Sequence, residues 1–151
     1  KSPAEVVAGV LRLSGEFNQP KRTVATRYNQ MIFMGQALNN PPSVEGWHQG
    51  KEWIGTGNLI ERLNFASEQL SDWENLGSRE IIQRVVDGTS GRSSPESLVD
   101  GCLDELGALL VSEETRSALV EFASKDLDTN INGRVSQIMQ LVVASPEFQR
   151  A

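Results

Sequence analysis

Apolar side chains recur at intervals of three and four residues along almost the whole chain, and this spacing limits the fold more than any other feature. Such spacing collects the apolar groups on one side of an α-helix, whereas a half-buried β-strand needs strict alternation. No stretch of useful length alternates. The sequence therefore predicts an all-α fold, an irregular bundle of about seven helices in a single domain spanning residues 1–151.

Serine followed by proline and glutamate marks several predicted helix starts. Ser2, Ser94 and Ser145 each precede a proline, and a glutamate follows that proline one or two positions later. A serine side chain accepts hydrogen bonds from the free amides of a first turn, and proline fits the first helical position. In the first helix Glu5 completes a capping box with Ser2.

The predicted helices follow from these starts and from the apolar spacing. We expect the second helix to turn Val24, Tyr28, Met31, Ile32 and Gly35 toward the core. The predicted extents are a first helix ending near Gly15, a second over about residues 23–38, a third over about 56–70 with Ile60 inward, a fourth capped by Ser78, a fifth starting at Ser94, a sixth capped by Ser112, a seventh over about 132–144 and a final turn from Ser145.

A long segment between the second and third predicted helices breaks the pattern. Residues 39–57 contain Pro41, Pro42 and four glycines, among them Gly46, and they carry Trp47 and Trp53. Proline and glycine oppose a regular helix, and a loop this long within a domain needs a reason. The sequence predicts one long, structured loop.

Two interpretations of the loop tryptophans remain open. The favoured one buries Trp47 and Trp53 against the helices, so that they hold the loop in place. In the other, the two indoles form an apolar platform that binds a sugar or a peptide, rimmed by polar groups. The candidate binding residues in that case are Gln36, Asn40, Glu45, Trp47, His48 and Trp53.

Residues for catalysis or metal binding are sparse. His48 is the single histidine, and a zinc site needs three or four protein ligands, so we expect an exposed loop residue. Cys102 lies in an apolar helical pattern and is interpreted as a buried residue. We assign no catalytic residue, metal ligand or cofactor, and the sequence leaves open whether the chain belongs to an enzyme.

Residues 126–133 carry oxygen-bearing side chains at alternate positions, as a calcium loop does. The closing bidentate glutamate of an EF-hand is missing, because Met139 stands six residues after Gly133. A polar turn between helices is the favoured interpretation, and a calcium-stabilised turn is the alternative.

Charge and hydropathy exclude some partners. Twenty Asp and Glu residues exceed fourteen Lys and Arg residues, giving a net charge of −6, which argues against nucleic acid. No segment approaches the roughly 20 apolar residues of a transmembrane helix. The chain begins with Lys1, and we expect a fragment of a longer protein.

The same loop carries a family resemblance. The run from Met34 to Trp47, with Gln36-Ala37-Leu38 and Pro41-Pro42-Ser43-Val44, resembles the hallmark motif of a bacterial family, domain of unknown function 1800 (DUF1800). Gly50, Trp53-Ile54 and the run Arg62-Leu63-Asn64-Phe65-Ala66 fit the same pattern. The sequence departs from it at His48, where the family usually has proline.

The resemblance implies a bacterial protein that often bears an export signal, and hence an extracytoplasmic location in the periplasm or envelope. It implies that this chain is the C-terminal part of a longer protein, and that its gene commonly neighbours those of a sulfatase-like secreted family. It implies no established activity, cofactor or catalytic residue.

Two functional hypotheses follow. The leading one is a non-catalytic helical module that packs against the N-terminal part of the same protein or against an envelope protein. Its loop motif would be held in shape by Gly35, Pro41, Pro42, Gly46 and Asn64, with Asn64 bonding loop backbone groups. The alternative is an accessory or substrate-contacting part of an extracytoplasmic enzyme acting on polysaccharide or sulfated substrates.

Overall fold

The computed structural model describes residues 1–17, 19, 22, 24–47, 50–71, 75–89, 94–125 and 130–150, with residues 51 and 56 described by their backbone alone. The regular elements of the described residues are all helices, with one isolated bridge between Ser43 and Gly46, so the all-α prediction is confirmed. Its elements are α1 (Pro3–Ser14), α2 (Val24–Phe33), the 3-10 helix η1 (Gly50–Trp53), α3 (Thr56–Ser71), α4 (Leu76–Gly88), α5 (Pro95–Glu105), α6 (Glu113–Ser124), α7 (Ile131–Ala144) and α8 (Pro146–Arg150).

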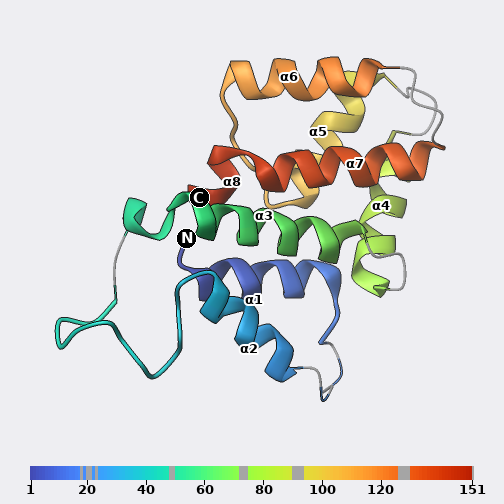
Figure 1. Ribbon diagram of the computed structural model, residues 1–151. Coiled ribbons are helices and arrows are strands. Elements are labelled where there is room, and N and C mark those ends of the chain that lie inside the picture. The colour runs from blue at the N-terminus through green and yellow to red at the C-terminus, as the bar shows by residue number, and fades with distance from the viewer. Residues whose placement is uncertain are drawn as a thin grey trace.

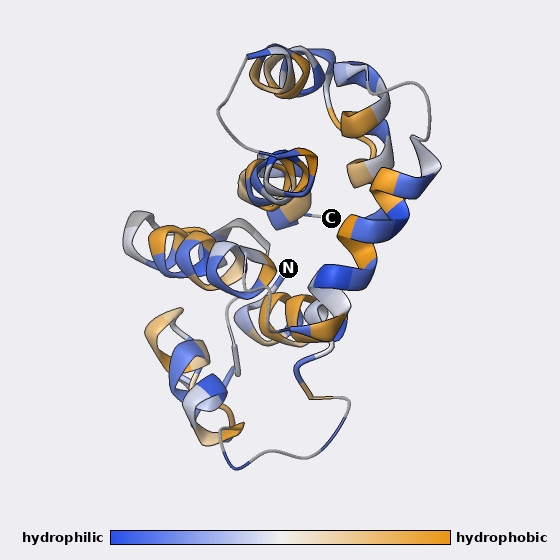
Figure 2. Ribbon diagram, turned by 90° about the vertical axis from the view of Figure 1, so that its right-hand side faces the viewer, coloured by the Kyte–Doolittle hydropathy of each residue, from blue (hydrophilic) through white to orange (hydrophobic). Residues whose placement is uncertain are grey.

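Four helices lie one above another across the molecule. Figure 1 shows α6, α7, α3 and α1 in this order from top to bottom, with α4 and α5 crossing them at one end. Figure 2 looks nearly along the four axes and places α2 at the far side of the bundle from α4. The loop between α2 and η1 extends sideways beyond the helices (Figure 1). Among the described residues, no helix is long and apolar enough to cross a bilayer.

The core lies between α3, α7 and the helices on either side of them. Val10, Leu70, Val99, Ile138 and Met139 are among the side chains with almost no exposed surface. Apolar burial on this scale is the main favourable term in folding, at about 25 cal/mol for each Å² removed from water. Cys102 is also fully buried, as expected.

Most predicted helix starts coincide with the observed caps. Ser2 Oγ accepts from Glu5 N, and Glu5 Oε2 accepts from Ser2 N, so the capping box is present. Ser94 and Ser112 cap α5 and α6 through their side chains. The final turn predicted from Ser145 is the short helix α8.

The start predicted for the fourth helix is wrong. α4 begins at Leu76, and Asn75 occupies the N-cap position. Ser78 lies inside the first turn, where its buried hydroxyl donates to the Gln69 carbonyl at 3.1 Å. Its side chain therefore joins α4 to α3 and does not cap its own helix.

The predicted C-terminus of the second helix is also wrong, because α2 ends at Phe33 and not near Leu38. Gly35 has a φ of +96°, a left-handed conformation that glycine adopts without a steric cost. Its N–H donates to the Ile32 carbonyl and the Gln36 N–H donates to the Met31 carbonyl. These two bonds form a Schellman motif, which ends the helix.

The expected inner face of the second helix is wrong for most of its residues, and only Met31, which is partly buried, packs against the core. α2 contributes no buried residue to the core, and Val24, Tyr28 and Ile32 are 60%, 38% and 40% exposed. They are four residues apart and so share one side of the helix. α2 packs against α1 and α3 at the edge of the bundle, and this side remains largely open to solvent. Ile60 of α3, expected inside, is 53% exposed.

Candidate functional site

The loop after α2 forms a projecting arm, residues 39–46, on a fixed base. At its start Asn39 adopts a φ of +67°, and the Asn40 N–H closes a turn onto the Ala37 carbonyl at 3.0 Å. At its tip the Gly46 N–H donates to the Ser43 carbonyl at 3.1 Å, and Gly46 has a φ of +99°. These turns bend the chain outward and back, as Figure 1 shows beside α2.

Residues 39–45, including both prolines, are exposed. Val44 at the tip is fully exposed, at 107% of its reference area. An apolar side chain in this position is not buried by any part of the described chain, so it contributes no hydrophobic stabilisation to the fold. The exposed arm is therefore a candidate contact surface.

The base of the arm is held by tryptophan. Trp53, at the end of η1, is 5% exposed, and Trp47 is partly buried. Their ring centroids lie 6.0 Å apart with the planes tilted by 35°, a favourable arrangement for an aromatic pair. The indoles thus lie where the arm meets the helices, with neither ring standing out in solvent.

Gln36 is buried and joins the arm to α1. Its side-chain Oε1 accepts from the Ala4 N–H at 2.9 Å, which satisfies a free amide in the first turn of that helix. This oxygen is therefore already occupied within the protein. Tyr28 Oη donates to the Leu38 carbonyl at 3.3 Å and so connects α2 to the base of the arm.

The structure therefore places five of the six candidate binding residues, and they lie in different environments. Gln36 and Trp53 are buried, Trp47 is partly buried, and Asn40 and Glu45 are exposed on the arm. His48 lies outside the described residues. The five described side chains do not converge on one open surface.

The residues expected to shape the motif are also separated. Gly35 and Gly46 occupy left-handed backbone positions, and a Cβ built on Gly35 would lie 3.0 Å from Asn58 Nδ2, so a neighbour does approach closely. Pro41 and Pro42 lie on the exposed arm. Asn64 is exposed on α3 and makes no side-chain hydrogen bond with the described part of the chain.

Sequence reasoning missed Arg62, which lies two residues before Asn64 and is fully buried. Both of its terminal nitrogens donate to the Lys1 carbonyl at 3.0 Å, and this holds the start of α1 against α3. Burial lowers the pKa of Arg62 from its usual value, and the charge of Glu5 partly opposes this effect. A signal was present, because Arg62 falls three and four residues before the buried Phe65 and Ala66.

A second polar group holds α2 to the bundle. Arg27 Nη2 pairs with Glu16 Oε1 at 2.8 Å, and the two side chains are only 15% and 9% exposed. Arg27 Nη1 donates to Gln30 Oε1 at 3.0 Å, and the guanidinium lies 5.9 Å from the Phe65 ring centroid. A largely buried pair of this kind fixes orientation more reliably than it adds stability.

This pairing leaves the outer surface of α2 without charge, and the arm carries one charged side chain, Glu45. Arg27 is the single charged residue between positions 24 and 44, although 23% of the chain is charged. The side chains that α2 exposes are uncharged, and Phe33 at its end is 66% exposed. We call Val24, Tyr28 and Ile32, together with Phe33 at the end of the helix, the α2 face. The α2 face is an uncharged, largely apolar candidate interaction surface, and the arm is a second candidate surface that carries a single charge.

The rest of the described chain offers little chemistry. It holds no group of three or more His, Cys, Asp or Glu side chains that could bind a metal ion. Burial raises the pKa of the Cys102 thiol to about 12, which keeps it protonated and unreactive at neutral pH. Of the predicted calcium loop, residues 126–129 lie outside the described residues, and Asn130 caps α7 by accepting from Gly133 N.

The comparisons place the chain by sequence. The model of the family described as "Protein of unknown function (DUF1800)" matches residues 1–150, which covers both the arm and the helices around it. No curated protein and no solved structure matches the chain.

Proposed function

We propose, from the premise that this chain belongs to the DUF1800 family, that it is a non-catalytic helical module that binds a protein partner through the α2 face and the arm. The family description assigns no function, so the proposal depends on the surface itself. Its main support is that α2 directs an apolar stripe outward and its one charge inward.

The chemistry of this surface restricts the partner. The α2 face exposes Phe33 and Ile32, and the arm exposes Val44 at its tip with Glu45 as its one charged side chain, so both offer apolar contact with little charge. The α2 face fits an apolar, uncharged protein surface, because a charged partner would lose water there without gaining an ion pair. The partner we propose is another part of the same polypeptide or a separate envelope protein with an apolar groove.

A substrate-contacting role for the arm receives less support. The sugar-binding interpretation needs open indole faces and free amide groups, whereas Trp53 is buried and the Gln36 oxygen accepts from Ala4. An extracytoplasmic location is part of our proposal. Its support is the family resemblance, and fractionation of cells that express the full-length protein would test it.

Site-specific photocrosslinking in the full-length protein tests the interaction. A benzophenone side chain is placed at Phe33 or Val44, and the matched control carries it at Leu110, which is 91% exposed but lies away from this surface. Because exposure is high at all three positions, a difference in crosslinking reports the local partner.

Crosslinks from Phe33 and Val44 to one and the same protein segment, absent from Leu110, are expected. Mass spectrometry then shows whether the segment belongs to the same polypeptide or to another protein. A second variant, Ile32→Asp, places a charge within the α2 face and should abolish the crosslink from Val44. Equal crosslinking at all three positions, or crosslinking unaffected by Ile32→Asp, would overturn the proposal.

A further inference from the structure

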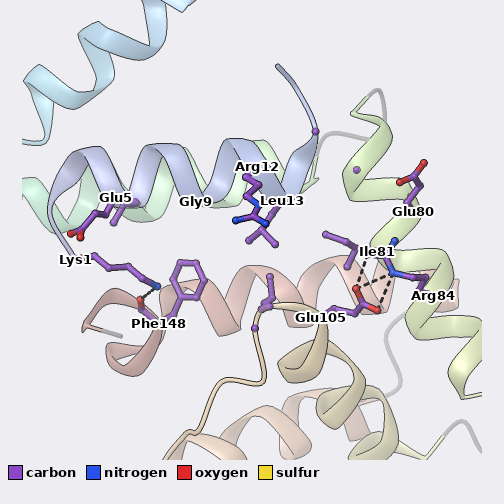
Figure 3. A pocket seen from close by; sticks show the side chains of 15 residues that line it. Lys1, Glu5, Gly9, Arg12, Leu13, Glu80, Ile81, Arg84, Glu105 and Phe148 are labelled. Carbon is purple, nitrogen blue, oxygen red and sulfur yellow. Dashed lines mark hydrogen bonds and ion pairs between the residues drawn. The ribbon is translucent and has the colours of Figure 1, made fainter. Parts of the chain in front are cut away.

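A separate groove lies on the other side of α1, away from the arm. It is bounded by α1, α4, the end of α5 and α8, and it has a volume of about 480 Å³. Figure 3 shows it between α1 and the segment that carries Phe148. This volume falls within the range of about 300–1,000 Å³ that is usual for small-molecule sites.

The floor of the groove is apolar, and its α1 wall has a glycine, Gly9, at one position. Leu13, Ile81, Leu106 and Phe148 line it. Gly9 lies on the α1 wall between Glu5 and Leu13, and a Cβ added there would meet nothing within 4 Å. Glycine inside a helix costs about 1 kcal/mol relative to alanine. No packing contact requires it here, and its effect is to keep the groove open.

The charged residues around the groove are mostly paired already. Arg84 donates to both oxygens of Glu105 at 2.7–3.0 Å. Glu5 accepts from Ser2 N at 2.6 Å within the capping box. Lys1 Nζ donates to the Phe148 carbonyl at 2.8 Å and lies 4.0 Å from the centroid of that ring.

Two lining charges have no hydrogen bond or ion pair with the described part of the chain, namely Arg12 and Glu80. Figure 3 shows the Arg12 guanidinium extending from α1 into the groove, whereas the Glu80 carboxylate points away from it. The unpaired charge that faces the groove is therefore positive. Arg12 lies about two helical turns from Glu5, a separation of roughly 10 Å along α1.

We propose that this groove binds a small organic anion with an apolar body. The carboxylate or sulfonate end pairs with Arg12, because a guanidinium donates two parallel hydrogen bonds to such a group. The apolar body lies over Leu106 and Phe148, in the space that Gly9 leaves open. This site is independent of the α2 face and the arm.

Titration of the folded chain with 2-naphthalenesulfonate, followed by ¹H–¹⁵N NMR, tests the proposal. The probe joins a two-ring apolar body to one anionic group. We expect saturable shifts of the Gly9 and Gly107 amide signals, because both residues line the groove. The neutral counterpart 2-naphthalenemethanol should bind about tenfold more weakly, as it lacks the charge-assisted hydrogen bonds.

Two variants and two matched controls locate the site. Arg12→Gln should weaken binding of the sulfonate about tenfold, while Arg79→Gln, the same change at an exposed residue outside the groove, should leave it unchanged. Gly9→Leu should fill the groove and abolish binding, while Ala8→Leu adds similar bulk outside it. Circular dichroism confirms that each variant is folded.

The proposal fails if Gly9→Leu binds the sulfonate as tightly as the unaltered chain does. It also fails if the neutral compound binds equally well, or if the shifts fall on Ala118 and Leu141, which line the separate groove between α6 and α7. The Arg12→Gln variant still tests the proposal if Gly9→Leu disturbs the helix, because Arg12 is exposed and contributes nothing to the core.

Discussion

Replacing Trp53 by alanine should destabilise the protein more than any change on the arm itself. The side chain is 5% exposed, so nearly all of its surface leaves water on folding. Tryptophan buries about 150–250 Å², and truncating such a residue to alanine costs about 3–5 kcal/mol, including the cavity left behind. Trp47 is partly buried, and Trp47→Ala should cost about 2 kcal/mol.

The contact between the two rings adds a measurable coupling. Their centroids are 6.0 Å apart, and aromatic pairs of this kind contribute about 0.5–1.5 kcal/mol beyond burial. The double variant should therefore cost less than the sum of the two single variants by roughly 1 kcal/mol. Urea unfolding followed by circular dichroism at 222 nm gives all three values.

Val44→Ala is the matched control on the same loop. Val44 is fully exposed, so this change should alter the free energy of unfolding by less than about 0.5 kcal/mol. A loss below about 1 kcal/mol for Trp53→Ala would refute the reasoning, since the indole would then not anchor the arm. A Val44→Ala loss as large as that of Trp53→Ala would refute it equally.

Three further predictions concern the helices. Gly35→Ala should cost about 1–2 kcal/mol in urea unfolding, because alanine is strained at φ +96° and its Cβ would crowd Asn58. Cys102 should resist thiol reagents at pH 8 while folded and react after unfolding. Because its pKa is raised from 9.0 to about 12, stability should fall as pH rises above 9, where only the unfolded thiol ionises. Hydrogen bonds from Ser112 lower the pKa of Glu147. This carboxylate therefore stabilises the fold above its unfolded pKa, and the stabilisation is lost as pH falls through the folded pKa. Glu147→Gln should flatten the acid side of the stability profile. An unchanged acid profile in that variant, or rapid thiol labelling of the folded chain, would contradict these assignments.

The helical class and most helix starts were predictable because they depend on neighbours in the sequence. A serine cap acts within one turn, so Ser2, Ser94 and Ser112 behave alike in any all-α surroundings. The error at Ser78 has the opposite cause. Its hydroxyl finds the Gln69 carbonyl of the preceding helix, a partner that local spacing does not reveal.

The candidate site was only partly predictable for a similar reason. The prolines and glycines of residues 39–57 locate the loop, and the tryptophans indicate an anchor. Which side chains around the tryptophans remain free to bind a ligand depends on contacts between residues that are far apart in the sequence. Gln36 is occupied because the start of α1 lies against it, and Asn64 is exposed while Arg62, two residues before it, is buried.

The sequence by itself determined that the chain forms amphipathic helices and where most of them begin, since both properties arise from side chains within a few residues of each other. Only the tertiary structure decided which apolar faces are covered. The stripe of Val24, Tyr28 and Ile32 has the spacing of a core face, yet α2 lies at the edge and turns it outward. Periodicity shows that a helix has an apolar side, but burial needs a second element to pack there, and that depends on the path of the whole chain.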